Sequence, residues 1–225
     1  MNAAWSSLII GMLAGCQCGA PSDEPDGGSR GVAADAGGLD AGASDAGRPR
    51  KDCFAPDAGG TYFIFPIKDL PFGCTHFKGN LGSGNMDLAS LNAGTIVEID
   101  GDLTIQNGDR PLDLQGLESL ERIRGRLFLS SLPLTSTSAM AKLKQVGSLQ
   151  LLINYQLEDI DLPALELIER DFSVLDHDRL RTLAGLQRLR AVGGEFWVRS
   201  NPRLPRLEID RFTSRVFIDG GVKIQ

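Results

Sequence analysis

The chain has 225 residues, with 23 Lys or Arg against 29 Asp or Glu, a net charge of −6 and a pI near 5.0. This balance argues against a nucleic-acid-binding protein that works through bulk positive charge, so we expect no nucleic-acid partner. The only histidines are His76 and His177, which leaves a His-rich metal site or a Ser/His/Asp or Cys/His catalytic arrangement poorly supplied. We therefore expect no metal and no other cofactor.

The N-terminus carries an apolar run at 8–15 that is shorter than the roughly 20 residues needed to cross a bilayer. Small residues follow it, as in a secretory signal. The segment Leu13-Ala14-Gly15-Cys16 resembles the lipobox of bacterial lipoproteins. The resemblance implies a signal peptide over 1–15, lipidation of Cys16 and attachment to a membrane through that lipid. The alternative is an apolar segment that ends in an ordinary cysteine.

Residues 16–52 are expected to form a disordered tether that starts at the lipidated cysteine. The stretch is dominated by Gly, Ala, Asp, Ser and Pro, and Asp-Ala-Gly recurs at 35–37 and 45–47. It holds too little apolar surface to offset its ordering entropy. Calcium binding by the aspartates is the alternative, but their spacing matches neither an EF-hand loop nor a nonapeptide repeat. Gln17 after the lipid cysteine implies, by resemblance to the enterobacterial sorting rule, an outer-membrane or cell-surface location, with the periplasm as the alternative.

Two further cysteines, Cys53 and Cys74, bracket the start of the folded part. We expect them to pair in an oxidising envelope, within an N-terminal cap at 53–95. Such a bridge would contribute roughly 3 kcal/mol by closing its loop. Cys18 is then left over, in the tether. The segment 61–67 is expected to cover the first turn of the repeats.

From residue 96 to 225 the chain is periodic at 20 to 24 residues. Each repeat joins a Leu-x-x-Leu-x-x-Ile half to a strand of the form Gly-x-Leu-x-Ile. The strand copies start 24, 22, 23, 24 and 20 residues apart, and they are 103–105, 127–129, 149–151, 172–174, 196–198 and 216–218. Glycine precedes four of them, whereas Arg170 and Ser214 take its place in the others. Glycine there is expected to allow a corner with unusual dihedral angles.

A pattern of this kind predicts a mainly β fold, a leucine-rich solenoid of about six turns with parallel sheets, because one turn cannot bury its apolar edge alone. After the strands, Asn154, His177 and Asn201 take equivalent places, each followed three residues later by leucine. Asparagine tolerates tight turns, so His177 is interpreted as a turn residue and not as a catalytic one.

The Gly-Asp-Leu-Thr-Ile run at 101–105 and the Val-Gly-Gly-x-Phe-x-Val-x-x-Asn-Pro-x-Leu run at 192–204 resemble the receptor L-domain. This is the right-handed β-helical module of the insulin-receptor and epidermal-growth-factor-receptor ectodomains. The resemblance covers roughly 74–225 and implies the fold and a tendency to bind, but not hormone binding, since nothing similar to the family's furin-like or kinase regions is present.

The centre of each strand is expected to point outward, which gives the series Thr104, Phe128, Gln150, Ser173, Trp197 and Phe217. Trp197 and Phe217 would then lie on adjacent turns, and neighbouring exposed aromatics often mark a contact surface. With Arg199 they are the candidate ligand-binding residues. The alternative is that a loop or the cap covers them. Phe128, three turns away, is interpreted as incidental.

Charge is segregated along the repeats. Residues 158–178 hold eight acids and one base, a net −7, whereas 179–215 hold nine arginines and three acids, a net +6. The arginine-rich part could hold an acidic polysaccharide, lipid A phosphates or an acidic protein face. Pairing of opposite charges between adjacent turns is the alternative that we favour.

These observations favour a non-enzymatic, lipid-anchored module of the bacterial cell envelope that binds a protein or a glycan through a face of the solenoid. A structural subunit of an envelope assembly is the alternative, because the last turn, 216–225, offers an unpaired strand edge. An enzyme is disfavoured. Asp171 and Glu195 come closest to a pair of acids on adjacent turns, but we expect each to face solvent separately.

Overall fold

The computed structural model describes residues 50–54, 61–63, 73–84, 95–108, 114 and 116–225, which lie within the unit Pro49–Gln225. The predicted signal peptide, the lipidation of Cys16 and all but the end of the tether fall outside these residues. Within them the predicted mainly β solenoid of about six turns is confirmed. Every strand pair in the described part is parallel, as stacked coils require.

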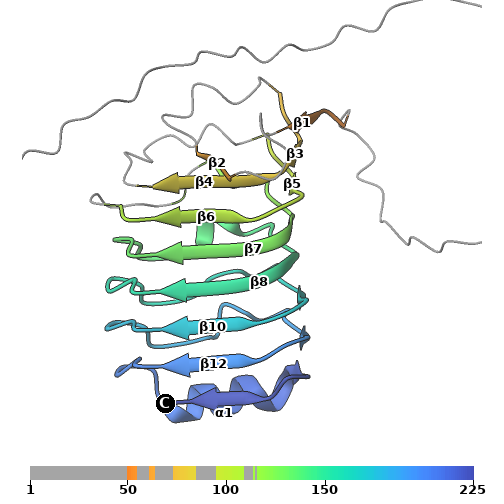
Figure 1. Cartoon of the computed structure of the whole chain (residues 1–225). Coiled ribbons are helices and arrows are strands. Elements are labelled where there is room, and N and C mark those ends of the chain that lie inside the picture. Colours follow the sequence, from red (N-terminus) through yellow and green to blue (C-terminus); the bar gives the residue numbers. More distant parts are fainter. Residues whose placement is uncertain (1–49, 55–60, 64–72, 85–94, 109–113, 115) are drawn as a thin grey trace, which may run out of the picture. The chain divides into compact units, whose positions relative to one another are not determined.

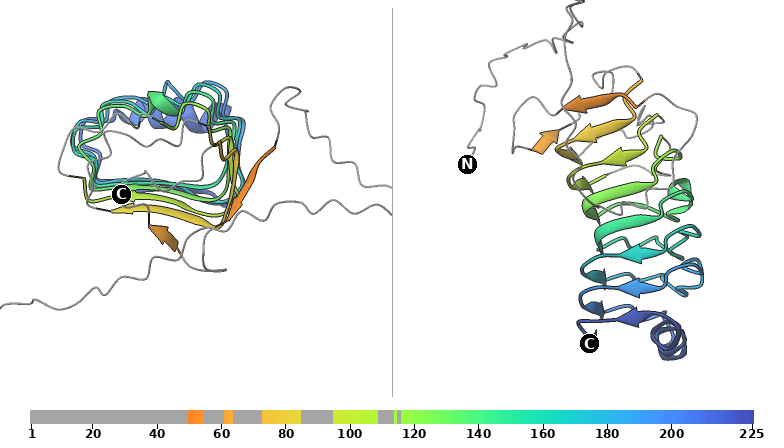
Figure 2. Two further views of the ribbon diagram at one scale, coloured as in Figure 1. Left: turned by 90° about the horizontal axis from the view of Figure 1, so that it is seen from above. Right: turned by 90° about the vertical axis from the view of Figure 1, so that its right-hand side faces the viewer.

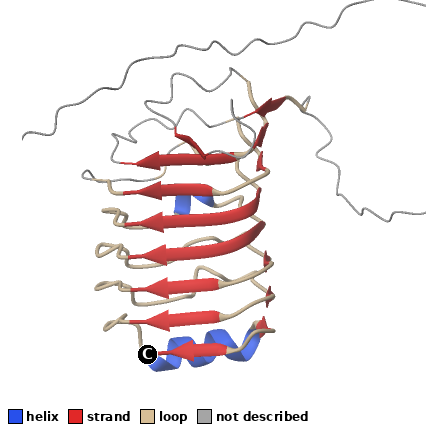
Figure 3. Ribbon diagram, viewed as in Figure 1, coloured by secondary structure: helices blue, strands red, loops and turns tan. Residues whose placement is uncertain are grey.

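One side of the solenoid is formed by a long series of strands, stacked in Figures 1 and 3. Buried and less buried residues alternate along strands such as Leu103–Gln106 and Phe196–Arg199, which suits a sheet buried on one face. The long series consists of β2 (Thr61–Phe63), β4 (Asn80–Gly84), β6 (Leu103–Gln106), the second halves of β7 (Arg122–Ser130) and β8 (Gln145–Leu152), β10 (Phe172–Leu175), β12 (Phe196–Arg199) and β14 (Val222–Ile224).

A short series of strands forms the adjoining side. It consists of β1 (Asp52–Phe54), β3 (His76–Lys78), β5 (Glu98–Ile99), the first residues of β7 and β8, β9 (Leu167–Ile168), β11 (Ala191–Val192) and β13 (Phe217–Ile218). The two series therefore begin well before residue 96. The described part of the expected cap, 53–95, continues both of them, and β2 pairs along β4 at the N-terminal end of the long series.

The third side, opposite the long series, carries turns, the 3₁₀ helix η2 (Ser138–Met140) and the α-helix α1 (Arg206–Arg215), as the view from above in Figure 2 shows. The core lies between the three sides. Its inward side chains form columns that are at most 1% exposed, among them Leu81, Leu103, Leu127, Leu149, Phe172 and Phe196 from the long series and Phe77, Ile99, Ile123, Val146, Ile168 and Val192 from the short series.

Helix α1 closes the core in the last turn and was not predicted. Pro205 precedes it in an extended conformation, and Ile209 and Phe212 bury one face of the helix. The Phe212 ring lies 4.8 Å from that of Phe196 and 5.9 Å from that of Phe172, and those two are stacked at 5.0 Å. A leucine-rich repeat ends here in an aromatic cluster that fills the space beneath the last complete coils.

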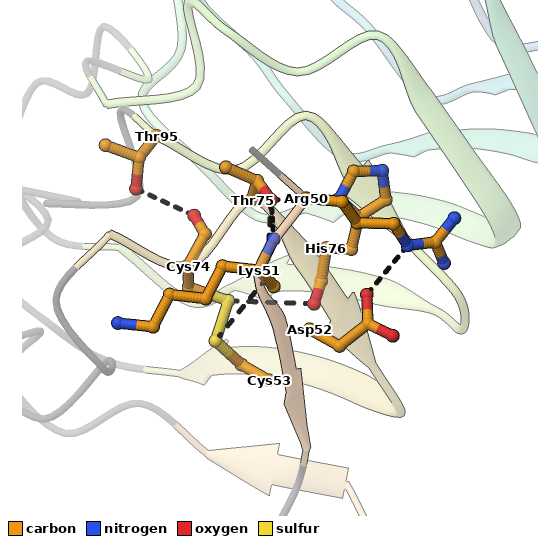
Figure 4. Close-up of a disulfide and its surroundings, with 8 residues drawn as sticks. All are labelled: Arg50, Lys51, Asp52, Cys53, Cys74, Thr75, His76 and Thr95. Carbon is orange, nitrogen blue, oxygen red and sulfur yellow. Dashed lines mark hydrogen bonds and ion pairs between the residues drawn. A yellow bond between two sulfur atoms is a disulfide. The ribbon is translucent and has the colours of Figure 1, made fainter. Parts of the chain in front are cut away.

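A disulfide joins Cys53 of β1 to Cys74, whose Cα atoms lie 5.9 Å apart (Figure 4). These are the two cysteines that the sequence analysis expects to pair. Around the bridge, the Lys51 amide donates to Thr75 Oγ1 at 2.8 Å, and Thr95 Oγ1 donates to the Cys74 carbonyl at 2.8 Å. The bridge and these bonds tie the first strand of the short series to the next coils.

The predicted position of the last strand is wrong. The repeat spacing aligns residues 216–218 with the long series, but Phe217 pairs with Ala191 in the short series. The long series continues instead at β14, where Lys223 pairs with Trp197. The reason is α1, whose ten residues lengthen the last coil, so that the repeat spacing alone misplaces the strand. The position of the glycine before the long strand, which the spacing assigns to Ser214, is occupied by Gly220, whose amide donates to the Gly194 carbonyl.

The glycines before the long strands are needed for a different reason from the one expected. Gly101, Gly125, Gly147 and Gly194 are not among the glycines with positive φ. A Cβ atom built on Gly125 would instead collide with the carbonyl group of Gly101 in the preceding coil. The backbones approach closely because the Gly125 amide donates to the Gly101 carbonyl at 3.0 Å. Close approach of the coils therefore selects glycine.

We expect Gly125→Ala to destabilise the protein by about 2 kcal/mol, because the added methyl group must push two coils apart. Gly108→Ala is the matched control, since its Cβ would meet only the side chains of Leu132 and Pro133. Urea unfolding of both variants measures the difference. An equal loss of stability in the two would contradict the steric explanation.

Candidate functional site

The outward face of the long series presents one residue per coil in register. The column is Gly82, Thr104, Phe128, Gln150, Ser173, Trp197 and Lys223. Two aromatic side chains, Phe128 and Trp197, are thus separated by the smaller Gln150 and Ser173. Phe128, which the sequence analysis set aside, is one wall of the depression that results.

This depression has a volume of about 270 Å³. Phe128 and Trp197 stand at its two ends, and Gln150 and Ser173 lie between them. Asp171 and Glu195, each directly before a long strand, line it, as do Leu152 and Leu175 at the other end of their strands. We call it the sheet hollow. Hydroxyl, amide and carboxylate groups between two aromatic side chains can hold a ligand that is both polar and flat-faced.

Trp197 is the best-defined group in the sheet hollow. The Arg199 guanidinium lies 5.8 Å from the ring centroid, and Lys223 Nζ lies 5.9 Å from it. Lys223 also pairs with Glu195 at 2.7 Å, so the cation is held beside the ring. The indole Nε1 is buried and has no hydrogen-bond partner among the described residues, so the ring and not its N–H is the group that the sheet hollow presents.

The two acids of the sheet hollow differ in what they do. Asp171 Oδ1 accepts the Glu195 amide of the next coil at 3.0 Å, as Asp102 Oδ1 accepts the Arg126 amide at 2.7 Å. Asp171 therefore links coils, and the Glu195 carboxylate is paired with Lys223. Each carboxylate lines the sheet hollow and still has acceptor capacity, because a carboxylate accepts about four hydrogen bonds.

The structure brings Trp197 and Arg199 together but not Phe217. The predicted contact between Trp197 and Phe217 is wrong, because β13 belongs to the short series. Phe217 is 67% exposed, so neither a loop nor the cap covers it. Lys223 takes its place beside Trp197 and was missed. A sequence signal for Lys223 was present. The Gly220-Gly221 pair stands before Val222-Lys223-Ile224, much as Gly193-Gly194 stands before the strand that holds Trp197.

The charged segments pair with each other to a small extent. Arg199 donates to Asp176 at 2.9 Å and holds the pKa of that carboxyl below its ordinary value. It is the only arginine of 179–215 whose ion pair, among the described residues, reaches the acidic segment 158–178. Arg206 and Arg211 pair within α1, with Asp210 and Glu208. Pairing between turns therefore accounts for one arginine and leaves most of the positive charge uncompensated.

Asn154, His177 and Asn201 form a ladder inside the corner that follows the long series. Each comes after a residue with φ between 52° and 62°, namely Ile153, Asp176 and Ser200. Asn201 Oδ1 accepts the His177 amide at 3.1 Å, and His177 Nδ1 accepts the Asn154 amide at 3.1 Å. Asn154 Oδ1 accepts the Leu132 amide at 3.0 Å in turn. His177 thus has the role of a turn asparagine.

Burial lowers the pKa of His177 to about 4, against the opposing effect of the Asp176 charge and of nearby backbone carbonyls. Its Nδ1 acts as an acceptor, so the neutral ring carries its proton on Nε2. That atom is buried without a well-formed hydrogen bond, although the Leu151 carbonyl is close enough to favour the protonated ring. The ring is neutral and fixed, and it does not reach the sheet hollow.

No group of three or more His, Cys, Asp or Glu side chains in the described ranges is arranged to hold a metal ion. In the same ranges, no helix has the length and apolar character needed to cross a bilayer. Compared with protein-family models, curated proteins and solved structures, the chain gives no match. The function of the molecule must therefore be inferred from its own surface.

We expect His177→Asn to make stability less sensitive to acid. A His pKa below its unfolded value of about 6.5 means that the unfolded chain binds the proton first, so stability falls from about pH 6.5 down to pH 4. Between pH 7 and pH 4.5 this group should account for a loss of roughly 2 kcal/mol. Urea unfolding at both pH values should show that loss in the parent and not in the variant. Identical pH dependence would contradict a buried His177 with a lowered pKa.

Proposed function

We propose that the chain is a non-enzymatic recognition module of the bacterial cell envelope that binds a glycan through the sheet hollow. The observation that carries this proposal is the half-buried ring of Trp197 at the end of a hollow lined by carboxylate, amide and hydroxyl groups. Sugar rings offer an apolar face for an aromatic ring and hydroxyl groups for such side chains. A protein that binds to the same hollow is the alternative ligand.

The dimensions of the sheet hollow favour an extended ligand. Phe128 and Trp197 are three strand spacings apart, which is about 14 Å for parallel strands. Gln150 and Ser173 lie between them and leave room for the ligand to run across the coils. An oligosaccharide of several rings could contact both aromatic side chains at once, whereas a single sugar could contact only one.

The charges in the sheet hollow favour a neutral glycan or one with amino groups. Asp171 and Glu195 line it, and no described arginine or lysine does. Carboxylates accept hydrogen bonds from hydroxyl and ammonium groups and repel carboxylate or sulfate groups. Arg199 and Lys223 lie beside the Trp197 ring but are paired with Asp176 and Glu195, so an acidic polysaccharide suits this surface less well than a neutral one.

The proposed location rests on the N-terminal sequence. The lipobox-like segment ending in Cys16 would anchor the protein by a lipid, and the Asp/Ala/Gly-rich tether would hold the solenoid away from the membrane. The Cys53–Cys74 disulfide is in keeping with an oxidising compartment outside the cytoplasm. The solenoid fold is compatible with the resemblance to the receptor L-domain. We propose the outer membrane or cell surface, and the periplasm as the alternative.

A structural subunit of an envelope assembly is the second candidate. Strand β14 pairs only with β12 among the described strands, so one of its edges is open. Val222 and Ile224, in register with buried residues of β12, are 41% and 36% exposed. A partner strand laid along β14 would cover both the open edge and these side chains.

The purified chain should bind a subset of oligosaccharides on an array that holds neutral, amino and acidic members, with the acidic ones absent from that subset. Trp197→Ala should weaken binding to the best member at least tenfold in calorimetry, because it removes the stacking surface. Phe217→Ala is the matched control, an exposed aromatic on the short series, and should leave binding unchanged. Equal effects of the two variants, or preference for acidic glycans, would contradict the proposal.

A further inference from the structure

Asn107 and Gly108 form the corner that follows β6. Asn107 has a φ of 57°, a left-handed conformation that asparagine tolerates better than most residues. Its amide donates to the Ser130 carbonyl of the next coil at 3.1 Å, and the residue is exposed to solvent. Of the seven asparagines in the sequence, Asn107 is the only one that a glycine follows. The chemistry open to this asparagine therefore differs from that of the others.

The ladder of corner side chains stops one coil short of Gly108. In the later corners, the amides of Leu132, Asn154 and His177 donate to the side chains of Asn154, His177 and Asn201 at 3.0, 3.1 and 3.1 Å. The side chain in register with Gly108 is that of Leu132, which has no acceptor, and its Cδ2 would lie 3.2 Å from a Cβ built on Gly108. The Gly108 amide accordingly has no hydrogen-bond partner among the described residues.

The peptide group between Asn107 and Gly108 is not confined by the backbone of the next coil. A Cβ built on Gly125 would collide with the Gly101 carbonyl group, whereas one built on Gly108 would meet only the side chains of Leu132 and Pro133, at 3.2 and 3.6 Å. Glycine also adopts a wider range of φ and ψ than any other residue. The peptide group can therefore turn so that the Gly108 nitrogen approaches the side-chain carbonyl carbon of Asn107.

We propose that Asn107 is a site of spontaneous deamidation, with the Gly108 amide as the nucleophile. The Gly108 nitrogen bonds to Asn107 Cγ, the bond from Cγ to the side-chain nitrogen breaks, and that nitrogen leaves as ammonia with the proton of the Gly108 amide. Water then opens the cyclic succinimide, at Cγ to give aspartate or at the backbone carbonyl to give isoaspartate. Both products add a negative charge, and isoaspartate also adds one atom to the backbone of the corner. No residue of the sheet hollow takes part, so the site is independent of the proposed function.

Incubation of the full chain in mildly alkaline buffer, followed by peptide mass spectrometry and an isoaspartate assay, tests the site. Asn107 should deamidate about tenfold faster than Asn154 or more, because the Asn154 side chain is buried and hydrogen-bonded through both its oxygen and its nitrogen. Gly108→Ala should slow the reaction at Asn107 about tenfold, because a Cβ restricts the turning of the peptide group. A rate at Asn107 no higher than at Asn154, or one unchanged by Gly108→Ala, would overturn the proposal.

A second variant tests the unheld Gly108 amide. Leu132→Asn supplies an acceptor in register with Gly108, as Asn154 does for Leu132, and should slow deamidation at Asn107 about fivefold. Leu132→Ala is the matched control, since it removes the same side chain without supplying an acceptor, and should not slow the reaction. In concentrated urea the parent chain and Leu132→Asn should react at the same rate. Equal rates for the two Leu132 variants in the folded chain would overturn the role of the free amide. If circular dichroism shows either variant to be unfolded, Gly108→Ala and the comparison with Asn154 decide.

Discussion

The spacing between successive coils, set by parallel backbone hydrogen bonds, is the constraint on which the rest of the structure depends. It stacks Leu103, Leu127 and Leu149 into one buried column, so that coils which could not bury their apolar edges alone share a continuous core. It also brings backbones together closely enough at Gly101 and Gly125 that a side chain does not fit. The repeat seen in the sequence is the consequence of this spacing.

The same spacing governs the polar groups between coils. Corner residues such as Asn154 and Asn201 satisfy the backbone groups that the strands leave unpaired at the turn, and Asp102 and Asp171 do so at the other end of the strands. A histidine can replace an asparagine in this ladder because its Nδ1 lies where the asparagine oxygen would lie. The replacement places a buried titratable ring in a structural position. This explains why the pKa of His177 is lowered although the residue does not line the sheet hollow.

The periodic part of the fold could be predicted from sequence, because the repeat is enforced coil by coil. The alternation in Leu103–Gln106 and Phe196–Arg199 identifies the inward side chains and thus also the outward column to which Trp197 belongs. The last coil could not be predicted in this way. Arg206–Arg215 forms a helix whose apolar residues complete the core. Because the helix adds residues without adding a strand, the repeat spacing predicted Phe217 in the long series, although it belongs to the short series. Phe128 was set aside because its own strand gives no sign of a hollow. The hollow arises because Gln150 and Ser173, which lie between Phe128 and Trp197, are smaller than these two aromatic side chains.

The central claim is that Trp197 faces a polar sheet surface with Lys223, and not Phe217, on the next coil. Nuclear Overhauser contacts in the intact protein test it most directly, without altering a residue. The account predicts contacts between the Trp197 ring and the side-chain protons of Lys223, whose Nζ lies 5.9 Å from the ring centroid, and none between the rings of Trp197 and Phe217. Contacts between the two aromatic rings would contradict the register of the last coil, and with it the position of Lys223 beside Trp197.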